Sequence, residues 1–398
     1  MASFAFHKVP TESFRSVLYL ELRKQAGRMS LKSWTGPQAI EEYLVADQKG
    51  RLVQSLKSFL SSRSLTATDV FGRKVLIEDL IATILRDLRV AAENQFGVTV
   101  DHVVAGRPVR FVGAENPEDD DYAVERLRLS FEKAGFKTVE FELEPAGAAY
   151  YYESSLDHDE LILIGDFGGG TSDFSVLHVG PNGRGQESIL ANDGVGIAGD
   201  AFDARIIRNV VSPVLGAGTM MRSVDKVLPV PSWVYMKLER WHHLSFLKTK
   251  DTLDMLASVS RSAFEPEAIQ GLLHLIRSDM GYHLHQAVQR AKAELSRSEQ
   301  TRLQYDDGMI QIDEPVRRVD FERWIAPEIE DIELAVDRAL RTAGVDRKAI
   351  DRVFLTGGTS FVPAVRRVFE TRFGADRIRT GHEFTSVARG LALRGRRM

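Results

Sequence analysis

The sequence predicts an α/β protein, because short apolar runs typical of strands alternate with amphipathic helical segments along the chain. Helical spacing is clearest over residues 76–95, where apolar side chains recur every three or four positions. Short branched runs follow at residues 102–105 and 139–143, as expected of strands. The proline after Glu144 suits the first turn of a helix over residues 146–152. This order of elements indicates layers of helices packed on a sheet.

The other elements are predicted in chain order from the same patterns. Residues 13–60 mix short strands with a helix near residues 37–43, and an acidic break at 117–121 precedes a helix over 122–134. Later strands are predicted at residues 161–164, 174–179, 187–191 and 353–356, with a strand pair near 303–312, and later helices at 201–211, 321–343 and 386–393. Residues 212–300 are expected to be mainly helical.

Composition sets limits on the class of protein. With 398 residues, 43% of them hydrophobic, the chain can bury one large core or two moderate ones, and its length favours two lobes. A net charge of -4 gives no overall basic field, so nucleic acid is not an expected partner. The absence of cysteine excludes disulfides and thiol catalysis and fits a reducing compartment such as the cytoplasm. No apolar run approaches the roughly 18 residues of a membrane span, so neither export nor a membrane location is expected.

The most informative segment follows the apolar run at residues 161–164 and reads Gly-Asp-Phe-Gly-Gly-Gly-Thr-Ser-Asp. Its three consecutive glycines, Gly168 to Gly170, let the backbone turn sharply and bring N–H groups close to an anion. Thr171 adds a hydroxyl, and Asp166 and Asp173 flank the turn with carboxylates that can orient the water shell of Mg²⁺. The segment therefore predicts a phosphate cradle with magnesium.

Three alternatives apply to the same segment. A plain glycine-rich hairpin turn explains the glycines but not the two flanking aspartates. A protein-kinase magnesium loop would need a His-Arg-Asp catalytic loop, which the chain lacks. A P-loop would lead into a helix, whereas this turn leads into the strand-like residues 174–179.

Other candidate residues are weaker when taken alone. Gly357, Gly358 and Thr359 follow a strand, and the glycine pair could approach a flat ligand or simply form a strand-to-helix turn. Lys292 and Ser296 share one face of a predicted helix, and that face could lie next to a ribose or simply point to solvent. The remaining two charged candidates are Glu144, at a strand end where carboxylates face ligand crevices, and Lys57, a lone charge. The histidines at 242–243, 283 and 285 lack metal-ligand spacing and are interpreted as packing or surface residues.

Taken together, the order and spacing of these segments resemble the nucleotide-binding domain of the DnaK-type, heat-shock 70-kDa chaperones, most nearly its YegD-like branch. The turn resembles the family's second phosphate motif, Asp-Leu-Gly-Gly-Gly-Thr-Phe-Asp. The resemblance implies that Gly168, Gly169, Gly170 and Thr171 bind phosphate and that Asp166 and Asp173 hold Mg²⁺ through water. Residues 144–149 resemble Glu-Pro-Thr-Ala-Ala-Ala.

By this resemblance the catalytic residues are Lys57, Glu144, Thr171 and Asp173, and Pro108 couples nucleotide state to the interface between lobes. Residues 196–203 resemble Leu-Gly-Gly-Glu-Asp-Phe-Asp and keep Gly199. The adenosine-binding residues would be Lys292, Ser296, Gly357, Gly358 and Thr359. Three departures stand in these adenosine motifs: Gln289, Ala293 and Phe361 replace the family's acidic residue and its two arginines.

The resemblance implies an actin-like ATPase fold with two lobes around a nucleotide cleft. Lobe I would comprise residues 1–157 and the C-terminal helix 384–398, and lobe II residues 158–383, with a helical subdomain at about 205–300. The implied ligands are ATP or ADP with Mg²⁺, and the implied activity is slow ATP hydrolysis in a cytoplasmic chaperone with client or co-chaperone partners. Two alternatives stay open: a non-hydrolysing nucleotide-dependent interaction module, and a sugar or metabolite kinase of the same superfamily, for which no acceptor-binding base can be assigned.

One family motif has no counterpart. The family opens with a first phosphate hairpin, Asp-x-Gly-Thr-Thr, yet this chain has no aspartate before Asp47 and no glycine before Gly27. The matching region begins near Glu12. The expectation is a truncated start that leaves lobe I incomplete.

Overall fold

The computed structural model describes residues 2–6, 9–25, 28–46, 50–153, 156–181, 189–223, 225–240, 247–278, 280–380 and 386–396. The chain divides into two compact units. The first comprises Met1–Gly199 and Ile329–Met398, and the second comprises Asp200–Glu328.

The N-terminal part of the first unit is built from small sheets and three helices. A hairpin joins β1 (Phe4–Phe6) to β2 (Val9–Thr11), and a three-stranded antiparallel sheet has the order β4-β3-β5. The bounds are β3 Val17–Gln25, β4 Arg28–Thr35, α1 Gly36–Val45, β5 Arg51–Gln54, the 3₁₀ turn η1 Leu56–Phe59, β6 Ala67–Val70, β7 Arg73–Leu76, α2 Ile77–Phe96, β8 His102–Arg107, α3 Pro117–Lys133 and β9 Thr138–Leu143. Strands β8 and β9 pair in parallel across the α3 crossover.

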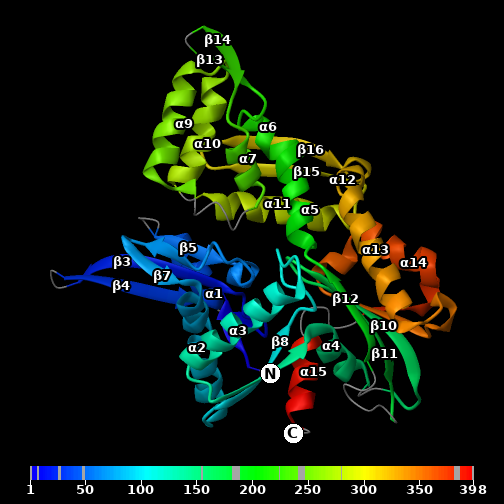
Figure 1. Ribbon diagram of the computed structural model, residues 1–398. Coiled ribbons are helices and arrows are strands. Elements are labelled where there is room, and N and C mark those ends of the chain that lie inside the picture. Colours follow the sequence, from blue (N-terminus) through cyan, green and yellow to red (C-terminus); the bar gives the residue numbers. More distant parts are fainter. Residues whose placement is uncertain are drawn as a thin grey trace. The chain divides into compact units, whose positions relative to one another are not determined.

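A five-stranded mixed sheet forms the centre of the first unit, in the order β12-β11-β10-β17-β18 (Figure 1). Its strands are β10 Glu160–Phe167, β11 Ser172–Val179, β12 Ile189–Val195, β17 Arg352–Thr356 and β18 Ile378–Thr380. Strands β10 and β11 form an antiparallel hairpin around the glycine turn, which confirms the predicted strand–turn–strand arrangement. Strand β17 pairs in parallel with β10 on its other side, although it lies far along the sequence.

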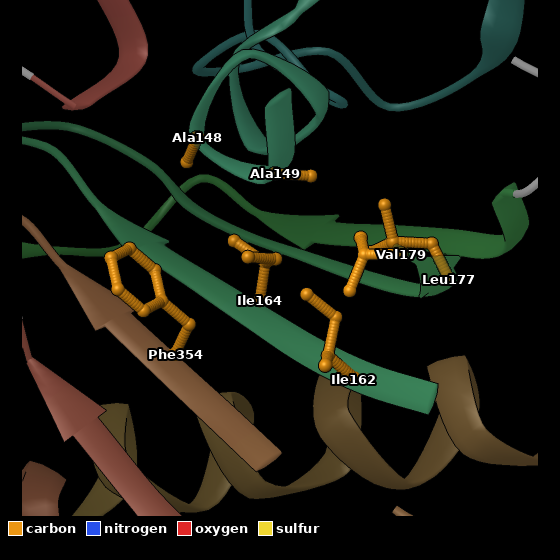
Figure 2. Packing of buried hydrophobic residues seen from close by; sticks show 7 residues of the cluster. All are labelled: Ala148, Ala149, Ile162, Ile164, Leu177, Val179 and Phe354. Atoms are coloured by element: carbon orange, nitrogen blue, oxygen red, sulfur yellow. The ribbon is translucent and has the colours of Figure 1, made fainter. Parts of the chain in front are cut away.

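Helix α4 (Glu144–Glu153) covers one face of this sheet (Figure 2). Ala148 and Ala149 of the helix pack on a cluster of buried strand residues, which comprises Ile162, Ile164, Leu177, Val179 and Phe354. The period of two in a strand places Ile162, Ile164 and Asp166 on this same face. The hydrophobic core thus extends directly to the carboxylate that precedes the glycine turn.

The opposite face of the sheet is covered by α14 (Pro363–Phe373), whose Phe369 contacts the rings of Phe167 and Phe174 edge-on or tilted. These two rings also contact each other at 5.7 Å between centroids. Aromatic packing of this kind fixes the ends of both hairpin strands beside the turn. The remaining helices of this unit are α13 Ala326–Ala343, which begins in the second unit, and α15 Ser386–Gly395.

Helices α4 and α15 lie beside each other (Figure 1). Their backbones come closest where two glycines meet. A Cβ on Gly390 would lie 1.6 Å from the carbonyl oxygen of Gly147, and a Cβ on Gly147 would lie 3.1 Å from the Leu391 side chain. Only the absence of both side chains lets the two backbones approach so closely. Helix α15 therefore fixes the position of α4 on the sheet.

In its described residues, the second unit is mainly helical, with two antiparallel hairpins. Its elements are α5 Gly199–Ile206, which starts at the boundary, the π-helical turn η3 Ile207–Val211, α6 Ser212–Val214, β13 Met220–Ser223, β14 Lys226–Pro229, α7 Trp233–Leu238, α9 Lys250–Ser262, α10 Pro266–Arg277, α11 Gly281–Leu295, β15 Gln300–Asp306, β16 Gln311–Arg317 and α12 Arg318–Trp324. Among the described helices of the chain, none is long and apolar enough to cross a membrane.

Several predicted bounds were wrong. Strand β12 extends to Val195, beyond the predicted end at 191, while residues 187–188 lie outside the described part of the chain. The β13–β14 hairpin lies in a stretch predicted as helical, and the single helix predicted over 321–343 is two helices, α12 and α13. Strand β18 was not predicted.

The predicted acidic break at residues 117–121 is instead the first turn of α3. The Asn116 side chain caps this helix by accepting the backbone N–H of Asp119 at 3.0 Å, and Pro117 occupies the first helical position. Acidic side chains in a first turn are stabilised by the helix dipole, so the acidic run belongs inside the helix.

We expect Asn116→Ala to lower the free energy of unfolding by about 1 kcal/mol, because it leaves a helix N–H without its acceptor. Urea denaturation measures the change. Asn94→Ala, at an exposed position inside α2, is the matched control and should be neutral or slightly stabilising, since alanine is the better helix former. Equal effects of the two substitutions would contradict the capping role.

Candidate functional site

The glycine turn between β10 and β11 is closed by its own backbone. The N–H of Gly168 donates to the carbonyl oxygen of Thr171 at 2.9 Å. Gly168 and Gly169 are exposed, whereas Gly170 is packed so that a Cβ there would lie 2.9 Å from the Val112 side chain. The open side of the turn therefore exposes main-chain groups, and the lack of side chains there leaves space for a ligand.

Asp166 and Asp173 face each other across the hairpin. They are direct partners in the antiparallel register of β10 and β11, so both side chains lie on the face covered by α4. Like charges directly opposite one another are unfavourable unless a cation or proton lies between them. This pair is the centre of the candidate site.

Asp173 is held by backbone groups from a distant loop. Its Oδ1 accepts the N–H of Val109 at 2.8 Å and that of Arg110 at 3.4 Å. The residue is only 1% exposed, and its Oδ2 is buried without a hydrogen-bond partner in the described part of the chain. A buried carboxylate oxygen without a partner is a position that a cation or ordered water can satisfy.

Glu144 and Lys57 form the other charged pair. Glu144 is the first residue of α4, where the prediction had placed it just before the helix, and its Oε1 lies 2.5 Å from the Nζ of Lys57. Lys57 belongs to the 3₁₀ turn η1. Their side chains are 40% exposed for Lys57 and 22% for Glu144, so both remain open to an incoming ligand.

The charges of these groups shift one another's pKa values. Burial raises the pKa of Asp166 to about 8, with Glu144 and Asp173 adding to the rise and Lys57 opposing it. Burial likewise raises the pKa of Asp173 to about 7, again with a contribution from Glu144. Three carboxylates thus share one lysine, which is the electrostatic condition for attracting a cation.

These shifts predict a pH dependence of stability for the ligand-free protein. Unfolding returns Asp173 to an ordinary carboxyl pKa, so the folded state binds more protons than the unfolded state between about pH 4 and pH 7. The free energy of unfolding therefore falls as pH rises through this window. From pH 6 to pH 8 we expect a loss of about 1 kcal/mol from this group, measured by urea denaturation.

Asp173→Asn should reduce the slope of that part of the stability profile, because the amide does not titrate, while Asp166, whose pKa is raised to about 8, keeps part of the slope. Asp121→Asn, at an exposed position on α3, serves as the control and should leave the profile unchanged. A profile that keeps its slope in Asp173→Asn would contradict the assignment.

The second glycine pair lies against the first turn. Gly357 has φ +86°, and a Cβ there would lie 2.0 Å from the carbonyl oxygen of Phe167. The Thr359 hydroxyl donates to the carbonyl oxygen of Gly168 at 3.4 Å, and Gly358 begins the 3₁₀ turn η6 (Gly358–Phe361). Parallel pairing of β10 with β17 brings together the glycine turn and residues 357–359, which were predicted separately as candidate binding segments.

The other predicted residues lie at or beyond the boundary with the second unit. Gly199 is the first residue of α5. Lys292 on α11 has its Nζ 2.8 Å from the Oδ1 of the fully buried Asp203, and the Ser296 hydroxyl donates to the Lys292 carbonyl oxygen at 3.4 Å. Lys292 is thus anchored inside its own unit, and the adenosine roles of these residues stay predictions.

The structure describes only some of the histidines that the sequence analysis considered as metal ligands. His285 has its Nε2 3.6 Å from the Oδ2 of Asp203, while residues 242–243 lie outside the described part of the chain. Within the described residues, no group of three or more histidine, cysteine, aspartate or glutamate side chains could hold a metal ion by itself.

Sequence reasoning missed the loop after β8. Val109 and Arg110 contribute backbone N–H groups to Asp173, and such groups leave no side-chain signature. The available signal was Pro108, which marks a strand end. The adjacent Val112 packs on Gly170, so this loop forms one wall of the site.

The site fits a nucleotide with Mg²⁺ on structural grounds. The exposed glycine backbone suits phosphate oxygens, and the buried Oδ2 of Asp173 lies opposite a second carboxylate. Because Mg²⁺ keeps several waters and is commonly bound through one or two carboxylates plus phosphates, it needs no dedicated cluster of protein ligands.

Comparison with protein families supports this interpretation. The family model described as Hsp70 protein matches residues 29–218 and 276–396. The matched ranges contain the glycine turn, Lys57, Glu144, Lys292 and the 357–359 segment. Because the match covers more than half of the chain, this protein belongs to the Hsp70 family, with that family's actin-like ATPase fold and a chaperone-like, ATP-binding function.

Proposed function

We propose that this chain binds ATP together with Mg²⁺ at the candidate site and hydrolyses it slowly, as a chaperone-related ATPase. The observation that carries the proposal is the opposed pair of the half-buried Asp166 and the buried Asp173, beside a glycine turn and next to the Lys57–Glu144 ion pair. Few other ligands combine dense negative charge with a divalent cation. Client or co-chaperone proteins are the proposed partners, as is general in the family.

The proposed division of roles follows from the geometry. The N–H groups of Gly169 and Gly170 and the Thr171 hydroxyl hold phosphate oxygens, and the Lys57 ammonium stabilises charge that develops on the transferred phosphoryl group. Glu144 and Asp173 accept hydrogen bonds from the attacking water and orient it. Mg²⁺, when bound, would neutralise phosphate charge beside Asp166 and Asp173.

A nucleotide-dependent interaction module without hydrolysis is the second candidate. One observation favours it: Glu144 already pairs with Lys57 at 2.5 Å. A carboxylate that stays on the lysine would orient water poorly, while nucleotide binding would persist.

Two measurements separate the candidates. Calorimetric titration with ATP, with and without Mg²⁺, tests binding, and single-turnover phosphate release tests hydrolysis. Magnesium-dependent binding with release supports the ATPase, whereas binding without release supports the interaction module. Release that requires an added sugar or metabolite would instead indicate a small-molecule kinase, and absence of binding would overturn both proposals.

A further inference from the structure

Residues 56–62 form a further wall of the candidate site. Lys57 reaches Glu144, and the Ser58 Oγ lies 3.6 Å from the position of a Cβ on Gly170. The Ser61 hydroxyl donates to the carbonyl oxygen of Val112 at 2.5 Å, and Val112 itself packs on Gly170. The position of the Lys57 ammonium therefore depends on how this short segment is held against the glycine turn.

The segment is weakly held by its own backbone. Three turn-like hydrogen bonds run from the N–H groups of Ser58, Leu60 and Ser62, with lengths from 2.9 to 3.2 Å. It follows Ser55, which has φ +50°, a left-handed conformation that residues other than glycine adopt at a cost. A single 3₁₀ turn has poor hydrogen-bond geometry and needs support from outside.

Arg126 on α3 supplies that support. Its Nη1 donates to three carbonyl oxygens of the segment: Phe59 at 2.9 Å, Leu60 at 2.8 Å and Ser62 at 3.1 Å. Its Nε donates to the Glu78 carboxylate on α2. Arg126 is 5% exposed and Glu78 is 6% exposed. The planar guanidinium points one edge at the turn and another at the carboxylate.

The surroundings keep this arginine in one orientation. Its guanidinium lies 5.4 Å from the centroid of the Tyr122 ring, one helical turn earlier on α3. A buried charge is stable only when it is paired and hydrogen-bonded, so Glu78 is needed to hold the guanidinium in place. Helices α2 and α3 are thereby joined to the turn that carries Lys57.

We propose that Arg126, held by Glu78, is a positioning residue that fixes the Lys57 turn against the phosphate-binding glycines. The proposal rests on the proposed function for its catalytic consequence. Arg126 acts through Lys57, and its guanidinium is turned to main-chain carbonyls of the turn and to Glu78.

The central test is Arg126→Lys, which keeps the charge but cannot donate to the turn and to Glu78 from one planar group. We expect single-turnover ATP hydrolysis to slow about 10-fold or more, because even a small displacement of a charge-stabilising group lowers the rate strongly. The dissociation constant for ATP should change less than 3-fold. In a Lys57→Ala background, Arg126→Lys should slow hydrolysis no further. Arg128→Lys, on the same helix, is the matched control and should hydrolyse at the wild-type rate.

Amide hydrogen exchange gives a readout that does not need hydrolysis. In Arg126→Lys we expect the amides of Ser58, Leu60 and Ser62 to exchange about 10-fold faster, with α11 in the second unit unchanged. Glu78→Gln should show the same pattern more weakly, since the amide still accepts a hydrogen bond. If wild-type protein does not hydrolyse ATP, the proposed function fails while this exchange pattern still supports the positioning role.

Two outcomes would overturn the proposal. One is unchanged exchange of residues 56–62 in a folded Arg126→Lys variant. The other is a rate loss that adds fully to that of Lys57→Ala, because it would show that Arg126 acts independently of the lysine.

Discussion

Gly390→Ala should lower the free energy of unfolding by about 3 kcal/mol or more, the upper range for overpacking a close contact. The added Cβ would lie 1.6 Å from the carbonyl oxygen of Gly147, so backbone rather than a flexible side chain must move. Either α15 leaves α4, or α4 shifts on the sheet. A shift of α4 would also displace Glu144 at its first residue, so nucleotide binding should weaken together with stability.

Urea denaturation and ATP titration of the variant measure both effects. The matched control is Gly395→Ala, on the same helix, where the new Cβ would make an ordinary contact of 3.4 Å with Val104. That substitution should be neutral or stabilising, because alanine favours helix over glycine by about 1 kcal/mol. A Gly390→Ala protein as stable as the wild type would show that α4 and α15 do not pack as closely as described.

Lys57→Ala should slow single-turnover ATP hydrolysis about 10²-fold or more, the range found when a preorganised charge-stabilising donor is removed. Among the described residues, the Lys57 ammonium opposes the raised pKa values of both Asp166 and Asp173. Without it, negative charge on the phosphoryl group would develop beside three carboxylates. Stability should change little, because the Lys57–Glu144 pair is partly exposed and such pairs contribute little to folding.

Phosphate release under single-turnover conditions measures this loss. Lys74→Ala, at an exposed position on β7, controls for the removal of one positive charge and should leave the rate unchanged. An unaltered rate in Lys57→Ala would remove Lys57 from the proposed mechanism and leave charge stabilisation to the glycine N–H groups.

Much of the centre of the site could be predicted, because its signals are local. The apolar run before Asp166 and the strand-like segment after Asp173 identify two strands, and three glycines identify the turn between them. The period of two then fixes both carboxylates on one face without any knowledge of the rest of the fold. Thr171 and the glycines follow from their place in the same segment.

What could not be predicted depends on contacts between segments far apart in the sequence. The backbone donors at Val109 and Arg110 carry no residue-type signature, and nothing local shows that Gly357 lies on Phe167. The first turn of α3 was missed for a different reason: its proline and acidic residues also suit a loop, and only the Asn116 cap distinguishes the two. The role of Arg126 required three carbonyl contacts that only the folded chain provides.

The first unit is built from two stretches of the chain that are synthesised at different times, one before and one after the second unit. The glycine turn is complete by residue 173, yet Thr359 follows its contact Gly168 by 191 residues, after the whole second unit. Helix α15 comes later still. Since domains fold from the N-terminus as they leave the ribosome, the nascent phosphate turn must wait for its covering segments. Nucleotide binding is therefore expected only after α15 has been synthesised.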